Sequence, residues 1–321
     1  REKRRQERRE HRERAADSSN AVPTHSSKWT RARNWLPQFS GALRANRVEE
    51  AYAGADLQYR LGEDTRVSGG AGYSTGVQRF AGTAGVSRQR SLYDSLNLDL
   101  RVDFKRGVAR RYESSMYHSG LNSVEAVIGL DDYFDYSWRE MGEVTLSLTG
   151  WRDDSDVWFA GRVERQQSLT STADIGLLQW DDMRPNPPVH EVDLHSVRFG
   201  ARFGEGYTPF GVTANRRLAL EGEIAADWLG SDADFSIWRL TWDWQQDTFW
   251  TRRWLPNTLD LHLLAGTSTG DVPPQRHTAL DVAMGPFSPF GAFRSVSGHP
   301  YEGSRYAALF WEHNLRTVPF E

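Results

Sequence analysis

The sequence contains no cysteine and no long apolar run. The absence of cysteine excludes disulfide frameworks, thiolate metal sites and cysteine nucleophiles. No stretch approaches the roughly 18 to 20 consecutive apolar residues of a membrane-spanning helix, which excludes a helical membrane protein. A β-barrel stays open, because its strands alternate apolar and polar residues and keep the average hydropathy low.

Charged residues fill the first 14 positions, REKRRQERREHRER, where eight basic and four acidic residues stand without an apolar one. Such a run cannot pack onto a core, so we expect an exposed helix or a disordered tail. Without this tail the chain carries 31 basic and 39 acidic residues, and we therefore expect no nucleic-acid partner. Residues 15–45, which contain Ser, Asn, Pro and Thr, are predicted to form a linker.

From Asn46 onward the apolar residues recur with period two, the pattern of strands with two different faces. In the clearest case, residues 96–105, one face carries Leu96, Leu98, Leu100, Val102 and Phe104. With weaker candidates included, about twelve strands are predicted. The segments that alternate are 51–60, 65–75, 79–88, 96–105, 143–151, 157–165, 197–203, 218–228, 238–245, 259–265 and 305–316.

The alternation alone leaves two architectures open. In a soluble sandwich the apolar face points inward, whereas in a membrane barrel it points to lipid. Several tryptophans near the ends of predicted strands fit the aromatic girdles of a membrane barrel, and they fit equally well as core residues. They are Trp151, Trp158, Trp228, Trp250 and Trp254.

Two motifs loosely match known sites and support them poorly. His190-Glu191 and His195 have the wrong spacing for a helical zinc site and lie in a run that alternates like a strand. Gly70, Gly72 and Gly76 lack the spacing and the following helix of a dinucleotide loop, so we interpret them as glycines that give room in a curved strand. We expect neither a metal nor a cofactor.

Carboxylates are plentiful, and any pair of them could serve a glycosidase, but the sequence does not give their separation. The candidates are Asp153, Asp154, Asp156, Asp181 and Asp182. The chain has no nucleophile elbow, P-loop or kinase motif. We therefore do not expect an enzyme.

The most informative region is a long segment rich in Gly and Pro, residues 267–303, which is followed by one more predicted strand. A connection of this length is normally functional or disordered. This region contains Phe290-Gly291-Ala292-Phe293-Arg294-Ser295, then Gly298-His299-Pro300-Tyr301-Glu302-Gly303, then Arg305-Tyr306-Ala307-Ala308-Leu309-Phe310-Trp311-Glu312-His313. Earlier in the chain stand Asn46-Arg47-Val48-Glu49-Glu50 and Asp131-Asp132-Tyr133-Phe134-Asp135-Tyr136.

In their order and spacing, these segments resemble the bacterial surface antigen family, the sixteen-stranded outer-membrane barrels related to the BamA and TamA assembly factors. The two earlier segments are similar to a branch of that family with a different periplasmic region. The resemblance covers about residues 46–321.

In that family the long loop folds back into the barrel, and a loop arginine pairs with an inward acidic residue of the next strand. Carried over by position, the resemblance implies that Arg294 pairs with Glu312. The period of two agrees, because it places Glu312 on the face of Ala308 and Phe310. Ser295 departs from the family motif, which usually has Gly there. The implied loop motif further comprises Phe293, Gly298, Pro300 and Tyr301.

The resulting prediction is an all-β fold, an antiparallel transmembrane β-barrel of which about 12 of 16 strands are present. We expect a tail at 1–14, a linker at 15–45 and a barrel at 46–321 that is incomplete at its carboxy end, with an inward loop at 267–303. Since an open sheet leaves unpaired edges in lipid, the chain is interpreted as a fragment of a longer protein.

The resemblance implies a location in the bacterial outer membrane and a role in inserting or translocating proteins or lipids. The implied partners are outer-membrane lipids and client proteins or lipids. Two alternatives remain: a passive, porin-like channel, and a soluble Trp-rich β protein that binds or cleaves carbohydrate.

Overall fold

The computed structural model describes residues 37–93, 96–114, 116–117, 119–128, 132–150, 155–170, 175, 183–204, 216–248, 257–284 and 289–315. The predicted tail and most of the predicted linker lie outside these residues. The prediction of a linker is wrong over residues 38–45, which belong to strand β1 (Gln38–Asn46). Small residues hide the alternation in β1, since Ser40, Gly41 and Ala42 separate the only two large apolar side chains, Phe39 and Leu43, and the next apolar residue is Ala45.

Twelve antiparallel strands form one sheet, in which each strand pairs with its neighbours in the order β1 through β11 and then β16. This confirms the predicted all-β antiparallel class and the predicted number of strands. After β1, the strands are β2 (Glu50–Leu61), β3 (Thr65–Ser74), β4 (Arg79–Ser91), β5 (Asn97–Arg110), β6 (Tyr136–Thr149), β7 (Ser155–Ser168), β8 (Asp193–Phe203), β9 (Arg216–Ala225), β10 (Phe235–Thr248), β11 (Asn257–Gly270) and β16 (Arg305–Asn314).

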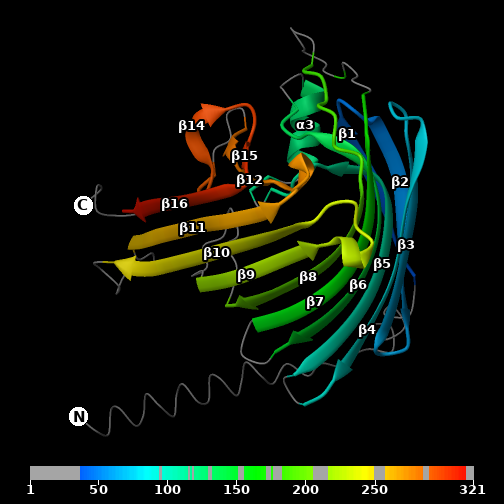
Figure 1. Cartoon of the computed structure of the whole chain (residues 1–321), viewed down its shortest axis with the longest axis horizontal. Coiled ribbons are helices and arrows are strands. Elements are labelled where there is room, and N and C mark those ends of the chain that lie inside the picture. Colours follow the sequence, from blue (N-terminus) through cyan, green and yellow to red (C-terminus); the bar gives the residue numbers. More distant parts are fainter. Residues whose placement is uncertain are drawn as a thin grey trace, which may run out of the picture. The chain divides into compact units, whose positions relative to one another are not determined.

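The connections after β5, β7, β9 and β11 reach the same end of the sheet, which we call the loop end. They carry the helix α3 (Ser119–Ile128) and several short elements (Figure 1). The short elements are η1 (Asp227–Leu229), η2 (Pro274–Arg276), β12 (Thr278–Leu280), β13 (Val282–Ala283), β14 (Phe293–Ser297) and β15 (Tyr301–Gly303). No helix in the described part of the chain is long and apolar enough to cross a membrane.

The predicted long loop starts later than expected, because residues 267–270 continue β11 and pair with residues 235–238 of β10. The run Thr267-Ser268-Thr269-Gly270 lacks large apolar side chains, so the pattern gives no sign of a strand there.

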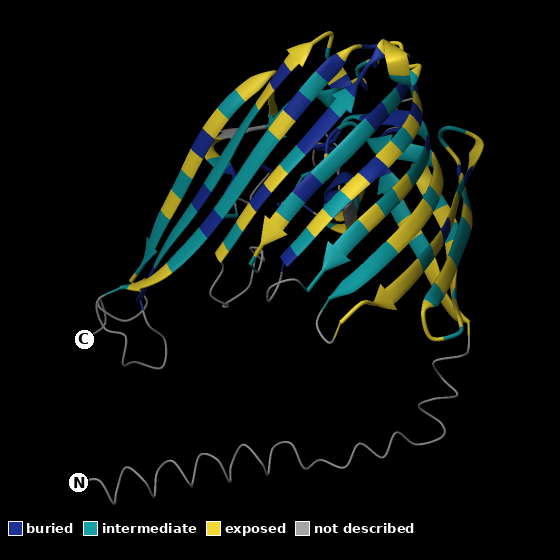
Figure 2. Ribbon diagram, turned by 60° about the horizontal axis from the view of Figure 1, so that its bottom comes forward, coloured by how far each residue is buried: buried dark blue, intermediate teal, exposed yellow. Residues whose placement is uncertain are grey.

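The sheet is curved (Figure 2). The face opposite to the side chains that line its interior, which we call the convex face, carries many exposed apolar residues. The side chains Val67, Val86, Val102 and Val144 are direct neighbours across β3 to β6, and each is between 37% and 49% exposed. A second row, Leu100, Leu146 and Phe159, crosses β5 to β7 and is between 46% and 54% exposed. The face that carries Leu100 and Val102 in the 96–105 segment is therefore turned outward.

The hydrophobic core lies at the loop end and not between two sheets. Its largest members are Phe134, just before β6, and Trp138, near the start of β6. Both are almost fully buried. Tyrosines and aliphatic side chains of the connections complete the cluster: Val48, Tyr112, Met116, Tyr117, Tyr133, Tyr136, Leu169, Val282, Met284 and Ala292. This core attaches the long connections to the strands that they join.

The tryptophans considered for a girdle do not share one environment. Trp158 lies under the guanidinium of Arg198, 5.2 Å from its ring centroid, and pairs across the sheet with Gly200. It is thus on the face of Arg198, opposite to that of Phe159. Trp228 is exposed in η1. Trp151, Trp250 and Trp254 lie outside the described residues.

The helix α3 contains a buried titratable group, Glu125. One of its carboxylate oxygens, Oε1, has no hydrogen-bond partner within the described residues. Burial raises the pKa of Glu125 to about 7. A carboxyl with a raised pKa stabilises the fold fully below its ordinary pKa, and this contribution is lost as the pH rises through about 7.

We therefore expect the backbone amides of α3 to have lower protection factors in hydrogen exchange at about pH 8 than at about pH 5. The variant Glu125→Gln should remove this difference, whereas Glu63→Gln, at an exposed position of the β2–β3 turn, should retain it. An unchanged pH dependence in Glu125→Gln would assign the titration to another group.

Candidate functional site

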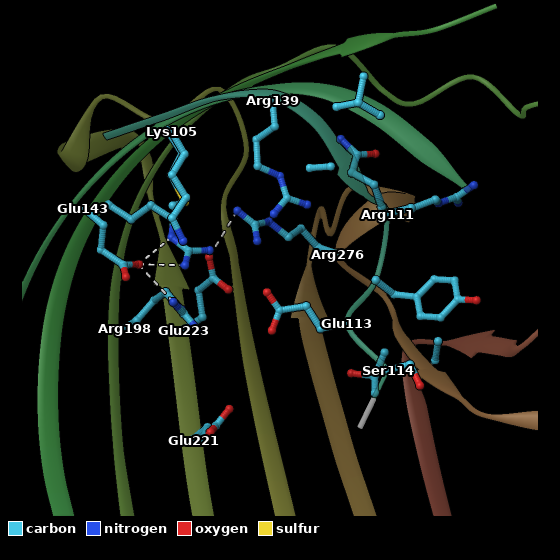
Figure 3. Close-up of a pocket in the computed structure, with 18 of the residues that line it drawn as sticks. Lys105, Arg111, Glu113, Ser114, Arg139, Glu143, Arg198, Glu221, Glu223 and Arg276 are labelled. Carbon is cyan, nitrogen blue, oxygen red and sulfur yellow. Dashed lines mark hydrogen bonds and ion pairs between the residues drawn. The ribbon is translucent and has the colours of Figure 1, made fainter. Parts of the chain in front are cut away.

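The concave face of the sheet encloses a cavity of about 800 Å³. Residues from all twelve strands line it together with residues 111–114 and part of the connection between β11 and β16. Figure 3 shows part of this lining. We call residues 271–284 of that connection the inward segment. Since successive residues of a strand point to opposite faces, the charged positions of the alternating strands meet here.

Arg276 of the inward segment lies among buried carboxylates of the sheet. Its Nη2 is 2.7 Å from Oε2 of Glu164 on β7 and 3.7 Å from Oε1 of Glu223 on β9. The Arg276 side chain is only 10% exposed, and both glutamates are buried. Burial alone would lower the pKa of Arg276, but the charges of Glu223 and Glu164 outweigh burial and raise it. Arg276 thus fixes the inward segment to the interior of the sheet.

Hydrogen bonds hold the rest of the inward segment to other connections. The side-chain amide of Gln275 accepts from the backbone N–H of His190 at 3.2 Å and donates to its carbonyl at 2.6 Å. The Tyr117 hydroxyl donates to the carbonyl of Val282 at 2.8 Å. The Tyr133 hydroxyl accepts from the N–H of Val282 at 3.0 Å. The segment is therefore attached to both the β5–β6 and the β7–β8 connections.

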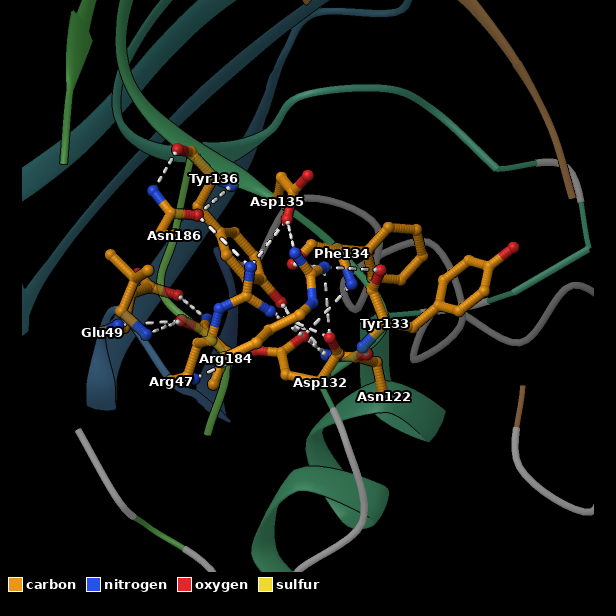
Figure 4. Close-up of polar contacts among 12 residues, drawn as sticks. Arg47, Glu49, Asn122, Asp132, Tyr133, Phe134, Asp135, Tyr136, Arg184 and Asn186 are labelled. Carbon is orange, nitrogen blue, oxygen red and sulfur yellow. Dashed lines mark hydrogen bonds and ion pairs between the residues drawn. The ribbon is translucent and has the colours of Figure 1, made fainter. Parts of the chain in front are cut away.

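A second polar cluster joins the turn between β1 and β2 to the segment before β6 (Figure 4). The fully buried Arg47 donates from Nη1 to the carbonyl of Asp132 at 2.8 Å and from Nη2 to Oδ1 of Asp135 at 2.7 Å. Oδ1 of Asp132 in turn accepts from Asn122 of α3 at 3.0 Å and from the Tyr136 hydroxyl at 2.9 Å. The segments 46–50 and 131–136, which carry part of the family resemblance, are thus in contact through Arg47 and Asp132.

The β7–β8 connection completes this cluster through Asn186. Its side chain accepts from the N–H of Tyr136 at 2.9 Å and donates to the carbonyls of Tyr136 and Leu169 at 2.9 and 2.7 Å. Since buried charges are stable only when paired and hydrogen-bonded, the cluster fixes three connections to one another.

The structure brings the predicted pair together: Nη2 of Arg294 is 2.9 Å from Oε2 of Glu312. The side chains are 59% and 34% exposed, so this pair is far more open to solvent than that of Arg276. Along β16, Leu309 and Trp311 are exposed at 60% and 70% on the opposite face, as the period of two predicts. The functional role of the pair stays a prediction.

The other residues of the predicted loop motif surround this pair. The ring of Phe293 lies 5.1 Å from that of Phe310 on β16 and 6.1 Å from that of Tyr301. Gly298 has a φ of 109°, a conformation that favours glycine. Pro300 is half-buried, whereas Ser295, the departure from the family motif, lies exposed within β14.

The residues considered for a zinc site, a dinucleotide loop or a glycosidase site make ordinary structural contacts where the structure describes them. Nδ1 of His195 lies 2.8 Å from the carbonyl of Leu229, and His190 meets Gln275 through its backbone. Gly70 and Gly72 lie in β3, as the interpretation as strand glycines predicts, but that interpretation is wrong for Gly76, which lies in the turn between β3 and β4. Asp156 is 3.7 Å from Arg202, and the other four candidate carboxylates lie outside the described residues.

Sequence reasoning missed Arg276, Glu164 and Glu223. The two glutamates lie at polar positions of two predicted strands, 157–165 and 218–228. The alternation in these strands predicts that both side chains point to the polar face. Arg276 follows Pro273-Pro274 in the segment that was expected to fold inward, but nothing in the sequence ranks it above Arg294.

Comparison of the sequence with models of protein families and with curated proteins finds no match. The relation to the surface antigen family therefore stays a prediction that depends on the quoted motifs.

Arg276→Gln should destabilise the chain by about 3–5 kcal/mol, because it leaves buried Glu164 and Glu223 without their loop cation. Arg294→Gln, which breaks the exposed pair, should cost about 0.2–1 kcal/mol. Denaturant unfolding of both variants measures this difference, and limited proteolysis should cut the inward segment faster in Arg276→Gln only. Equal costs would show that Arg276 does not anchor the segment.

Proposed function

We propose that the chain is part of an integral outer-membrane β-barrel whose convex face contacts lipid. The observation that carries this proposal is the apolar, exposed convex face, with its direct neighbours Val67, Val86, Val102 and Val144. Soluble proteins rarely expose contiguous apolar patches of this kind, because each square ångström in water costs about 25 cal/mol. Hydrocarbon removes this cost.

The buried charges of the concave face support the same proposal. Glu164 and Glu223 point away from the convex face and are neutralised from within by Arg276. In a membrane barrel, ionised side chains are placed in the interior, where partners and water are available. The two faces thus have the chemistry that lipid outside and a polar interior require.

Within this location, the proposed role is insertion or translocation of proteins or lipids, as the family resemblance implies. The inward segment supports this role over passive diffusion, because it occupies the interior and is held by Arg276, Gln275 and the two tyrosine hydroxyls. A passive pore needs a water-filled interior, whereas the inward segment fills part of this one. The proposed partners are outer-membrane lipids and client proteins or lipids.

The charged cavity of about 800 Å³ favours a porin-like channel as the second candidate function. Single-channel conductance separates the two, because deletion of residues 271–303 should change the conductance of a machine whose interior this connection fills. A conductance unaffected by the deletion would favour the porin.

Membrane fractionation of cells that produce the protein, followed by gel mobility of the detergent extract with and without heating, tests the location. We expect the protein in the outer membrane and a faster mobility without heating. Solubility without detergent would refute the proposal and turn attention to a sugar site.

A charge on the convex face gives a sharper test. Val102→Arg, in the middle of β5, should cost about 2–4 kcal/mol if this face meets the centre of a bilayer. At a face exposed to water the same change should stay within about 0.5 kcal/mol. Leu92→Arg is the control, because Leu92 is similarly exposed but follows β4 in a turn, where arginine should cost about 0–1 kcal/mol. Unfolding in lipid vesicles measures both costs, and a small equal cost would contradict lipid contact.

A further inference from the structure

One wall of the interior cavity gathers five cations from four consecutive strands and the inward segment (Figure 3). We call them the basic cluster: Lys105 of β5, Arg139 of β6, Arg162 of β7, Arg198 of β8 and Arg276. The register of the sheet and the anchoring of the inward segment bring them together, so the cluster is a product of the fold and not of local sequence.

The ionic partners of the basic cluster are three buried or half-buried glutamates. Glu143 lies 2.7 Å from Arg162 and 3.0 Å from Arg198. Glu164 lies 3.5 Å from Arg139, 3.6 Å from Arg162 and 2.7 Å from Arg276, and Glu223 lies 3.7 Å from Arg276. Five cations thus share three carboxylates, which leaves an excess of two positive charges.

A fourth carboxylate, Glu113, acts through its charge on Arg139 and Arg276, and it reduces this excess without removing it. Glu113 and Glu221 face the same cavity, but neither comes within 4.0 Å of a basic-cluster nitrogen in the described structure. Asp281 accepts hydrogen bonds from Ser114 at 2.8 Å and Tyr133 at 3.2 Å instead. Within the described ranges, Lys105 has no carboxylate within 4.0 Å at all.

Orphaned donors accompany the excess charge. Nε of Arg276 and Nε of Arg139 are buried and have no hydrogen-bond partner in the described residues, as is also true of Nε of four arginines outside the basic cluster. Buried polar atoms are satisfied in most proteins by the chain, by water or by a ligand, so the two donors of the basic cluster are available to a bound anion. Like charges in a partly dry interior also repel strongly, and an anion relieves that repulsion.

We propose that this wall of the cavity binds the phosphate group of a phosphomonoester, with Lys105 and the arginines of the basic cluster as its ligands. A phosphomonoester carries about −1.5 to −2 charges near pH 7, so it neutralises excess positive charge more fully than a single carboxylate does. Guanidinium groups present paired donors that suit phosphate oxygens. At about 800 Å³ the cavity holds a phosphorylated small molecule or the headgroup of a lipid. The site does not depend on the proposed function, because soluble and lipid-borne phosphate share this chemistry.

Calorimetric titration of the purified full chain in detergent tests the site, with inorganic phosphate, glycerol 3-phosphate and short-chain phosphatidic acid as probes. We expect all three to bind, and added salt to weaken the binding. Equal affinities of glycerol 3-phosphate and phosphatidic acid identify a soluble ligand, and a much tighter phosphatidic acid identifies a lipid. Absence of binding by all three probes overturns the proposal.

Lys105→Gln should weaken phosphate binding about tenfold, because it removes one charge-assisted contact, and Lys105→Arg should preserve most of it. Arg101→Gln is the matched control, since Arg101 lies on the same face of β5, about 13 Å along the strand, and pairs with Asp103. The control should bind phosphate like the unchanged protein. An equal loss in Lys105→Gln and Arg101→Gln would reduce the effect to general electrostatics and refute the site.

Discussion

Buried carboxylates on the concave face require cations, and this requirement connects the sheet to its longest connection. Glu164 and Glu223 are almost fully buried on β7 and β9. An ionised carboxylate in such a place is stable only with a cationic partner. The strands supply two such partners for Glu164, which are Arg139 and Arg162. The closest cation, Arg276, comes from the inward segment. The position of that segment, the shape of the cavity and the charge of its wall all depend on this pairing.

The two arginines of the β11–β16 connection show how burial sets the energy of an ion pair. The pairs have similar distances, 2.7 Å for Arg276 with Glu164 and 2.9 Å for Arg294 with Glu312. Water competes for the exposed Arg294 and screens its charge, whereas Arg276 has little access to water. Arg294 therefore contributes little stability, while Arg276 and the tyrosine hydroxyls hold the inward segment in place.

The sequence predicts the strands better than the site, and the reason is the range of the interactions. Period two is a local property, so the faces of β5 and β16 follow from ten residues each. The first strand was not predicted, because its glycine and alanine residues do not distinguish an apolar face from a polar one. Arg276 and Glu164 are 112 residues apart, and Arg47 and Asp132 are 85 apart. Strand register and the anchoring of the loops bring such partners together, and a local sequence pattern contains no information on either. The segments that carry the family resemblance include Arg47 and Asp132, but the sequence does not show that these two residues are in contact.

The two proposals concern opposite faces of the same sheet, and the solvent on one face sets the electrostatics on the other. If hydrocarbon covers the convex face, field lines from the basic cluster pass through a low-dielectric wall on that side and concentrate in the cavity. The uncompensated positive charge then attracts an anion more strongly than it would in a sheet surrounded by water. The same wall makes the neutralisation of Glu164 and Glu223 more demanding, which in turn favours retention of Arg276 inside. Lipid contact outside and anion binding inside are thus separate claims, each with its own test, and the first strengthens the physical basis of the second.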